Sequence, residues 1–528
     1  MGAPRCDNRE KARRYATRTQ GIRGISVKEE PMKYDVVIVG GGAAGSVLAS
    51  RLAADEQTSV LVLEAGPDYP DSAHLPDDVK FGHTRFAEAP DSIHNWALRG
   101  TITEEQGEIH VAQGKVIGGG SSINGQAMQR GFPEDFDSWS ALGNDEWSYD
   151  KVVPYFRKSE RDLDILDNYC HGSNGPIPVR RRQTGPWPPI QQAFHSACVQ
   201  AGFGTTNDKN GLHPAGLGVT PSNNLDGVRV STAMGHLNPV RHYLNLTVRG
   251  RVFVRKIVIE HSKAVGVEAE SGGKVFRIDA DRVVLSSGAI RSPHLLMLSG
   301  IGPEDHLQQF GIPVIRHLPG VGQNLMNHLS AQTTFKVKDG VSLAGHHRDA
   351  IHFALHYTAE GSSTVNDMVL RSSPVVDERE ERVPGVRTKY LIGDVPPEKA
   401  ARISCTLGLP DGSGYVQLAS ADPAVQPSFN YVIYSIQTTF DWCGQVCDWQ
   451  RDCWSPTPIR TWPITGSTPR TTFWPATTLW TSGYARPWAP PGMCQGPAKW
   501  DRIQIRWRSL TNTAESRASK GFGWLMHR

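Results

Sequence analysis

The strongest constraint on the fold is the stretch YDVVIVGGGAAGSVLASRLA, which begins at Tyr34 and reads as an apolar strand, a glycine turn and a helix. Gly40, Gly42 and Gly45 have the G-x-G-x-x-G spacing, which permits a sharp turn, close approach to a pyrophosphate and tight helix packing. A second strand, SVLVLEAG, brings Glu64 to the place where a carboxylate accepts a hydrogen bond from a ribose 2′-OH. A plain strand–helix–strand turn would not need this acid. The stretch predicts a dinucleotide-binding unit, and the acid favours FAD or NAD over NADP.

Composition excludes several other classes of protein. The chain has 528 residues and a net charge of +3, so no nucleic-acid or acidic-membrane binding is indicated. No apolar run reaches the length of about 18 residues that a membrane span needs, and we expect a cytoplasmic protein. Eight cysteines in a chain of this length argue against a disulfide scaffold.

The first 33 residues differ in composition from the rest of the chain. They are basic and polar, without the apolar core of a secretory signal. We expect a disordered extension, with an Arg-rich organelle presequence as the alternative. Met32 stands just before the first strand and is a candidate alternative start.

Two further stretches carry a family resemblance. GKVIGGGSSINGQAMQRGFPEDFDSWSALG, at residues 114–143, is a glycine- and serine-rich loop followed by a helix-like segment, and such loops present backbone donors to an anion or a polarised ring. SSGAIRSPHLLMLSGIGPEDHLQQFGIPV, at residues 286–314, follows the strand DRVVLSS. Both closely resemble the signature segments of the glucose–methanol–choline (GMC) oxidoreductases, which are FAD-dependent, and especially the alcohol and choline dehydrogenase-like members. The resemblance covers residues 34–431.

The resemblance implies a set of cofactor contacts. The glycine turn would hold the FAD pyrophosphate, Glu64 would bind the adenosine ribose, and the backbone of Val254 would meet the adenine. Three residues of the first signature would lie along the isoalloxazine and ribityl portion. The full set is Gly40, Gly42, Ala43, Ala44, Gly45, Glu64, Val116, Asn124, Gly125 and Val254.

Two departures from the family pattern concern the flavin. Some relatives attach the flavin covalently through a histidine of the first signature, but this chain has Ile123 there, which implies non-covalent FAD. Asn327 stands where relatives usually carry aspartate, and the histidine after it, His328, is expected to be structural rather than catalytic.

The implied fold class is α/β, and α+β overall. A Rossmann-type FAD-binding domain with a parallel sheet would comprise residues 34–150 and 231–330. An antiparallel-sheet substrate-binding domain would comprise residues 151–230 and 331–431, including the alternating strand SGYVQLAS. No metal site is expected in either domain.

The family chemistry is hydride transfer from an alcohol carbon to flavin N5 while a histidine base removes the hydroxyl proton. In the family, that base lies in a C-terminal segment resembling H-x-S-G-T-C-K-M-G, with a second His or Asn nearer the end. The segment is absent here, because the only histidine after residue 431 is His527. We therefore predict no catalytic histidine pair, and so no catalytic residue, in this chain. The partners expected are a small-molecule alcohol and an unspecified electron acceptor.

The tail, residues 432–528, has a different composition from the rest of the chain. It holds ten of the 14 tryptophans, four of the eight cysteines and only five acidic residues, with no helix periodicity. Reading the last base of each codon with the first two of the next, the tail permits family text. Residues 492–501 permit HVSGTCKMG, residues 510–528 permit DQYGRVAGIEGLRVVDAS, and the start of the tail permits YLLDPNDLRLVRAG. We hypothesise a frame shift from about residue 432, and we expect the tail to be irregular.

Other interpretations of the chain stay open. It could be a lyase that uses FAD structurally, which would need a similar histidine. It could be a pseudoenzyme or gene-model product whose tryptophan- and cysteine-rich tail binds a partner. The third alternative is a metal site at Cys443, Cys447, Cys453 and Cys494, but their spacing matches no common zinc pattern and no histidine is nearby.

Overall fold

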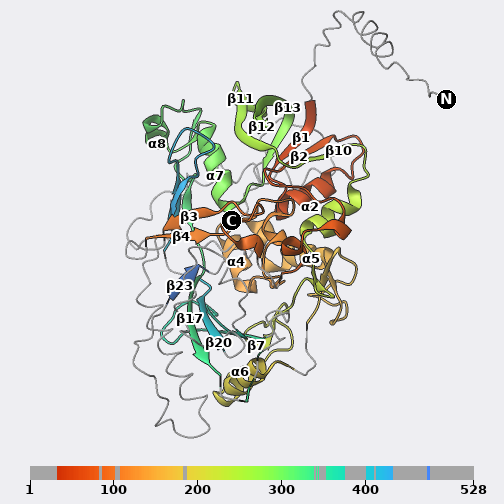
Figure 1. The fold of residues 1–528 in the computed structure, drawn as a ribbon, viewed down its shortest axis with the longest axis vertical. Coiled ribbons are helices and arrows are strands. Elements are labelled where there is room, and N and C mark those ends of the chain that lie inside the picture. Colours follow the sequence, from red (N-terminus) through yellow and green to blue (C-terminus); the bar gives the residue numbers. More distant parts are fainter. Residues whose placement is uncertain are drawn as a thin grey trace, which may run out of the picture.

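The computed structural model describes most of the chain up to Tyr431 and one short strand beyond it (Figure 1). The described residues are 33–82, 86–101, 107–181, 187–337, 340–341, 343, 353–374, 400–409, 412–431 and 472–475. The expected extension therefore lies outside the described residues, except that Lys33 already belongs to the first strand. Most of the tail also lies outside them.

The first sheet has six strands in the order β10-β2-β1-β13-β12-β11. Its members are β1 (Lys33–Val39), β2 (Val60–Leu63), β10 (Leu246–Arg249), β11 (Phe253–Glu260), β12 (Lys263–Ser271) and β13 (Lys274–Leu285). The first four in the order are parallel to one another, and β13, β12 and β11 form an antiparallel meander. This sheet confirms the predicted Rossmann-type core. In the described part of the chain, no segment after Tyr431 joins it.

The centre of this sheet is covered on both faces. Val36 and Ile38 of β1 pack with α2 (Ala43–Leu52) on one side, while Val37 and Val39 join the large core cluster on the other. Burial on both faces explains why the strand is a continuous apolar run rather than an alternating one.

The second sheet is antiparallel and has the order β23-β17-β20-β19-β18-β7. Its strands are β7 (Gly216–Val219), β17 (Leu329–Lys336), β18 (Phe353–Tyr357), β19 (Met368–Pro374), β20 (Ala400–Leu407) and β23 (Thr472–Pro475). Helix α6 (Pro189–Gln200) covers one face. The two regions predicted for the substrate-binding domain do meet in this sheet, since β7 pairs with β18.

A third sheet corrects one sequence expectation. It has the order β16-β21-β22-β3-β4, with β3 (Leu98–Thr101), β4 (Glu108–Val111), β16 (Gln323–Leu325), β21 (Gly414–Gln417) and β22 (Ser428–Asn430). SGYVQLAS forms β21 and belongs here, not to the antiparallel sheet of the predicted substrate domain. Its alternation fixed a half-buried strand but not the partner strand, which depends on tertiary contacts.

The remaining elements are short or lie outside the sheets. The helices are α3 (Asp77–Lys80), α4 (Pro133–Ala141), α5 (Tyr149–Ser159), α7 (Gly288–Leu298) and α8 (Glu304–Gln309). The strands are β5 (Glu160–Asp162), β6 (Ile177–Val179), β8 (Asn224–Leu225), β9 (Val228–Arg229), β14 (Ile301–Gly302) and β15 (Arg316–His317). Helix α4 confirms the helix-like segment after the first signature loop.

The tail contributes one described element. Strand β23 pairs antiparallel with β17, so the expectation of an irregular tail is wrong for these four residues. The four cysteines considered as a metal site and His527 lie outside the described residues.

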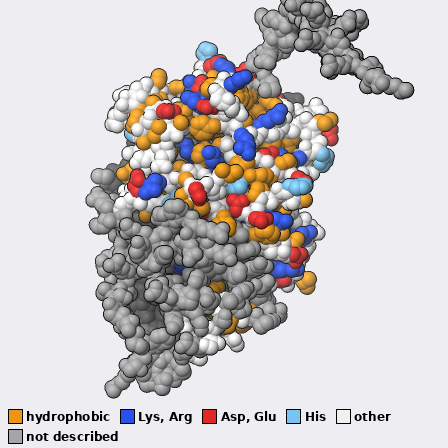
Figure 2. Space-filling view, viewed as in Figure 1, with side chains coloured by type: hydrophobic (Ala, Val, Ile, Leu, Met, Phe, Trp, Pro, Cys, Tyr) orange, Lys and Arg blue, Asp and Glu red, His pale blue; other side chains and the backbone are white. Residues whose placement is uncertain are grey.

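Among the helices that are described, none has the length and apolarity to cross a membrane. Figure 2 shows one face of the molecule, and acidic and basic side chains are interspersed over the described part of that face.

Candidate cofactor and active site

The turn between β1 and α2 has the geometry that its glycines predict. Gly40 has a φ of +96°, and a methyl group there would lie 2.6 Å from the Ser286 carbonyl oxygen. A methyl group at Gly45 would lie 2.1 Å from the Gly40 carbonyl oxygen, so this glycine allows α2 to pack against the turn. A methyl group at Gly42 would meet nothing nearer than 3.8 Å. A methyl group at Gly42 would therefore make only ordinary van der Waals contacts with the neighbouring backbone.

Glu64 closes the turn from the end of β2. Its carboxylate accepts hydrogen bonds from the Gly41 N–H at 3.0 Å and from the Gly66 N–H at 2.9 Å. Burial raises the pKa of Glu64 to about 7, against the opposing effect of these two N–H donors. The side chain is thus fixed at the tip of the strand and still has acceptor lone pairs for a hydroxyl group.

The first signature loop packs directly on this turn. The Gly118 N–H donates to the Gly41 carbonyl at 2.7 Å. Gly119 has a φ of +52°, and a methyl group there would lie 2.7 Å from the Gly42 Cα. Glycine is required at this contact because both the backbone angle and the distance exclude a side chain.

The second signature connects β13 to α7 beside the same turn. The Ser286 hydroxyl donates within 3.1 Å of the Val39 and Gly40 carbonyls, and the Ser287 hydroxyl donates to the Val39 carbonyl. These bonds hold the start of α7 against the carboxyl end of β1. Both signature segments and the glycine turn therefore converge at one edge of the parallel strands, where ligands bind in open α/β sheets.

A cavity of about 370 Å³ extends from this edge to strands β4, β16 and β21 of the third sheet. Six of the ten predicted cofactor residues line it, namely Gly40, Gly42, Ala43, Ala44, Glu64 and Val254. The lining also includes the segment between β16 and β17 and Tyr431. One continuous space thus joins the dinucleotide turn to the third sheet.

The other four predicted residues do not line this cavity. Gly45 serves helix packing through its contact with Gly40. Val116 packs its side chain with Ala87 and Ile123 in a small core cluster. The Asn124 side chain accepts a hydrogen bond from the Gln126 N–H at 3.0 Å, and a methyl group at Gly125 would face open space. Their predicted position along the isoalloxazine stays a prediction, whereas Gly119 and Gly120 of the same loop do line the cavity.

Sequence reasoning missed a cation–aromatic cluster of which Arg291 and Trp96 line the cavity. The Arg291 guanidinium lies 4.1 Å from the centroid of the Trp96 ring, and the Lys115 ammonium lies 4.8 Å from it. Burial lowers the pKa of Arg291 to about 10, and its Nε has no hydrogen-bond partner within the described residues. Arg291 belongs to the second signature segment, and the sequence of that segment did not indicate its contact with Trp96.

The far end of the cavity holds the sequence pair Asn327 and His328, with Tyr431 beside them. Burial, assisted by the charge of Arg371, lowers the pKa of His328 to about 4. The other histidine of the lining, His294, has its pKa lowered to about 3 by burial. Both imidazoles are neutral at pH 7 and far too weakly basic for an efficient general base.

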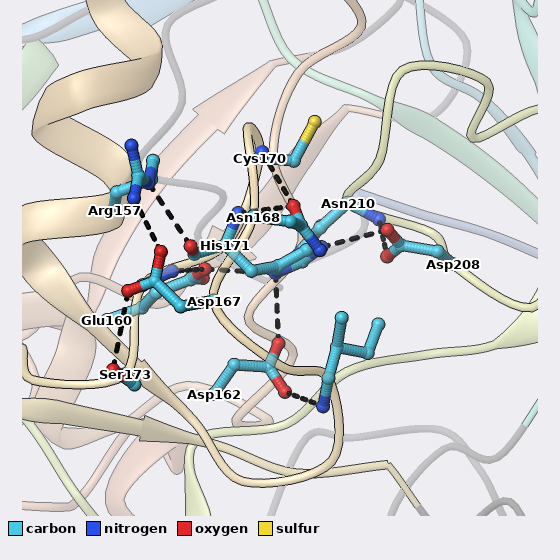
Figure 3. Close-up of polar contacts among 12 residues, drawn as sticks. Arg157, Glu160, Asp162, Asp167, Asn168, Cys170, His171, Ser173, Asp208 and Asn210 are labelled. Atoms are coloured by element: carbon cyan, nitrogen blue, oxygen red, sulfur yellow. Dashed lines mark hydrogen bonds and ion pairs between the residues drawn. The ribbon is translucent and has the colours of Figure 1, made fainter.

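A separate cluster has the ligand types of a metal site. Glu160, Asp162 and His171 are buried together (Figure 3). The His171 Nδ1 lies 3.0 Å from a carboxylate oxygen of both acids, and its Nε2 lies 2.8 Å from the Asp208 carboxylate. Burial by itself would lower the pKa of His171, but the hydrogen bonds to Asp162, Asp208 and Glu160 prevail and raise it to about 10.

Two arginines complete this cluster. Arg130 pairs with Glu160 at 2.7 Å, and Arg181 donates two hydrogen bonds to Asp162 at 2.7 and 2.9 Å. Three carboxylates thus face two guanidiniums and one imidazolium, so the charges balance without a metal ion. Both ring nitrogens of a protonated His171 are engaged in hydrogen bonds to carboxylates, so neither is free to coordinate a metal ion. The cluster is an ion-pair network that joins β5, β6 and the loop at Asp208.

The strand, glycine turn and cavity define a dinucleotide-binding α/β protein. The chain belongs to the GMC oxidoreductase family, because the model of that family matches residues 34–330.

Similar proteins agree with this assignment. An uncharacterized GMC-type oxidoreductase of Rhodococcus erythropolis is 35% identical over 397 residues, which is 75% of each chain. An oxygen-dependent choline dehydrogenase of Staphylococcus saprophyticus is 40% identical over 316 residues, 59% of this chain and 55% of that one. The match therefore spans little more than half of that relative. The crystal structure of pyridoxine 4-oxidase from Mesorbium loti superposes with a TM-score of 0.71 at 25% identity, covering 83% of this chain and 84% of that one.

The cavity fits the cofactor of this family, which is FAD. Gly42 and the first residues of α2 line the cavity, and the N–H groups of a helix N-terminus suit a pyrophosphate. The Glu64 carboxylate suits a ribose hydroxyl, and the buried Nε of Arg291 is a donor without a partner among the described residues. The cofactor is therefore FAD, and these residues are the ones available to hold it.

Proposed function

We propose that this chain is built as an FAD-dependent oxidoreductase that acts on the CH–OH group of a small alcohol, and that it lacks the base needed for turnover. The observation that carries the proposal is the continuous cavity that is lined by the glycine turn and Glu64 and also by His328 and Tyr431. A cavity of this shape brings a dinucleotide and a second, smaller molecule together.

Different residues along the cavity have different roles in binding the cofactor. Acceptance of a hydride at N5 is the chemistry that FAD supplies when it is bound. The α2 N-terminus binds the phosphates, and Glu64 orients the adenosine ribose. Val116, Asn124 and Gly125 are proposed to lie along the ring and ribityl chain. Attachment is non-covalent, since the residue at the attachment position is Ile123, a buried aliphatic side chain without a nucleophile.

Removal of the hydroxyl proton is the step that this chain cannot perform. An alcohol hydroxyl is a weak acid and needs a positioned base during oxidation. The cavity histidines, His294 and His328, are both too weakly basic. We therefore propose that FAD can bind while alcohol oxidation is slow or absent, and that a frame shift near residue 432 removed the base.

A spectroscopic test decides between these possibilities. The full chain is expressed in parallel with a matched control in which one base is inserted or removed near codon 432, so that the permitted text HVSGTCKMG is translated. We expect a flavin spectrum and alcohol oxidation with an artificial acceptor from the control, and little oxidation from the chain as it stands. Oxygen uptake in the control identifies whether oxygen is the acceptor. An active chain with an inactive control contradicts the proposal.

Sequencing genomic DNA and transcript across codons 428–436 tests the frame shift itself. Codons that do not spell the family text in the shifted frame exclude it. A chain that binds FAD stably in an intact reading frame, without oxidising any alcohol, supports the alternative of a pseudoenzyme that binds a partner through its tail.

A further inference from the structure

Helix α7 contributes a run of residues to the wall of the cavity. Among them, four have the spacing i, i+3, i+4 and i+7, which places their side chains on one face of the helix. These four are Arg291, His294, Leu295 and Leu298. The helix packs on β11, and the Ser299 hydroxyl at its end accepts the Ile257 N–H at 2.8 Å. This contact fixes the helix against the strand.

Trp96 links this helix face to the start of β11. The Arg291 guanidinium lies 4.1 Å from the centroid of the Trp96 ring, and that ring lies 6.2 Å from the Phe253 ring. Val252, just before β11, donates its N–H to the Glu64 carbonyl at 2.8 Å. All of these residues line the cavity. This part of the cavity therefore lies directly beyond the carboxylate that is proposed to bind the ribose.

The backbone of Val254 faces away from β12, toward the edge of the sheet. Residues in an antiparallel ladder alternate between hydrogen-bonded and non-hydrogen-bonded pairs. Ile257 faces Val267 in a non-hydrogen-bonded pair, because its N–H donates to Ser299 instead. Val254 pairs with Ala269, two positions further along β12, since β11 has one extra residue at a bulge between them. Val254 therefore has the same type of pair, and its N–H and C=O point out of the ladder side by side.

Two residues of the α7 face carry a buried nitrogen atom without a hydrogen-bond partner in the described part of the chain. These atoms are the Arg291 Nε and the His294 Nε2. His294 is only 2% exposed, and burial, together with repulsion from Arg291, lowers its pKa to about 3. Its imidazole is therefore neutral and can accept a hydrogen bond, whereas the guanidinium only donates. Because buried polar atoms are normally satisfied, the two residues point to a ligand that has an acceptor next to a donor.

The side chains around these two atoms are apolar. They are Trp96, Phe253, Leu295 and Leu298. Apolar walls with a few polar atoms suit a planar heterocycle, whereas a phosphate is better placed at the N-terminus of α2. Adenine is planar and has two edges on which an acceptor stands next to the N6 amine, one with N1 and one with N7. One edge matches the backbone of Val254, and the other matches Arg291 and His294.

We propose that Arg291 and His294 recognise the N7 edge of the FAD adenine, while the backbone of Val254 binds its N1 edge. The inference rests on the proposed function, since it takes FAD as the bound dinucleotide, and it adds which base the site selects. The guanidinium donates to N7, and the His294 imidazole accepts one hydrogen of the N6 amine, whose other hydrogen is left for the Val254 carbonyl. Stacking on Trp96 holds the guanidinium in place for this bond.

Deaza analogues of FAD test the base contacts without any turnover. Fluorescence titration of the full chain, freed of bound flavin, compares FAD with its 7-deazaadenine and 3-deazaadenine analogues. Both analogues keep the size and the N1 edge of adenine, and each lacks one ring nitrogen. We expect the 7-deaza analogue to bind at least about tenfold more weakly than FAD, because a buried charge-assisted hydrogen bond is lost. The 3-deaza analogue should bind as tightly as FAD.

Variants identify the residue that is responsible for the preference. Arg291→Met should bind FAD and the 7-deaza analogue equally. His294→Leu should weaken both and keep their ratio above one, since Arg291 still contacts N7. Lys115→Met removes the other cation beside Trp96, which is not among the described residues that line the cavity, and should retain the full preference.

The native chain alone can overturn the proposal, so the result does not depend on the folding of any variant. An arginine that only stabilises the fold, or only attracts the phosphates, would give equal affinities for FAD and the 7-deaza analogue. Equal affinities, or weaker binding of the 3-deaza than of the 7-deaza analogue, overturn the inference and leave the proposed function intact. A native chain that binds neither FAD nor the analogues contradicts the proposed function together with the inference.

Discussion

Replacing His171 by glutamine tests the ion-pair network of Figure 3 and should destabilise the protein severely. The change removes one positive charge from a site where Glu160, Asp162 and Asp208 contact the ring. A pKa raised from 6.5 to about 10 corresponds to about 5 kcal/mol of stabilisation. Breaking a buried pair typically costs about 3–5 kcal/mol, so both routes give the same range.

His74 provides the matched control. Its ring lies 2.6 Å from the Asp71 carboxylate, a shorter contact than any made by His171, but its side chain is 84% exposed. Exposed ion pairs contribute at most about 1 kcal/mol, so His74→Gln should hardly change the free energy of unfolding. Urea denaturation of the full chain, followed by far-UV circular dichroism, measures both variants.

The pH dependence of the stability gives the direction in which the effect of His171→Gln should change. A folded-state pKa above the unfolded value stabilises the protein fully below pH 6.5, and this contribution is lost as the pH rises toward 10. The stability difference between the native chain and His171→Gln should therefore shrink by about 2 kcal/mol between pH 6.5 and 8.5. Equal losses for the two histidine variants, or a difference that grows with pH, would refute the reasoning.

Two further predictions concern the dinucleotide turn. Gly45→Ala should lower the free energy of unfolding by about 1–3 kcal/mol or more, because its methyl group would clash with the Gly40 carbonyl. Gly42→Ala should leave the stability of the FAD-free protein unchanged and should weaken FAD binding. Thermal melts measure the stability of both variants, and flavin fluorescence titration measures their FAD binding. Glu64→Gln should weaken FAD binding by about tenfold through loss of a charged acceptor that also holds the Gly41 N–H, and an unchanged dissociation constant would contradict the role of Glu64.

The sequence predicted those parts of the fold whose signal is local. The glycine spacing and Glu64 predicted the first unit because they lie in one short stretch of strand, turn and helix, where Gly45 packs against Gly40. The antiparallel sheet was expected from the family resemblance. The partner of SGYVQLAS was not, since alternation gives the strand but not the sheet that it joins.

The candidate site was predicted only in part for the same reason. Gly42, Glu64 and Val254 line the cavity, whereas Val116 turns its side chain into the core. Arg291 was missed because its contact with Trp96 joins positions about two hundred residues apart, and no periodicity records such a pair.

By itself, the sequence determined the dinucleotide-binding unit, the family and the absence of the family's histidine segment, because each is written in contiguous residues. Only the tertiary structure decided which charges meet. Folding surrounds His171 with three carboxylates, and it brings Arg291 against Trp96. Electrostatic energy depends on distance and burial rather than on order along the chain, so the ion-pair network could be found only in three dimensions.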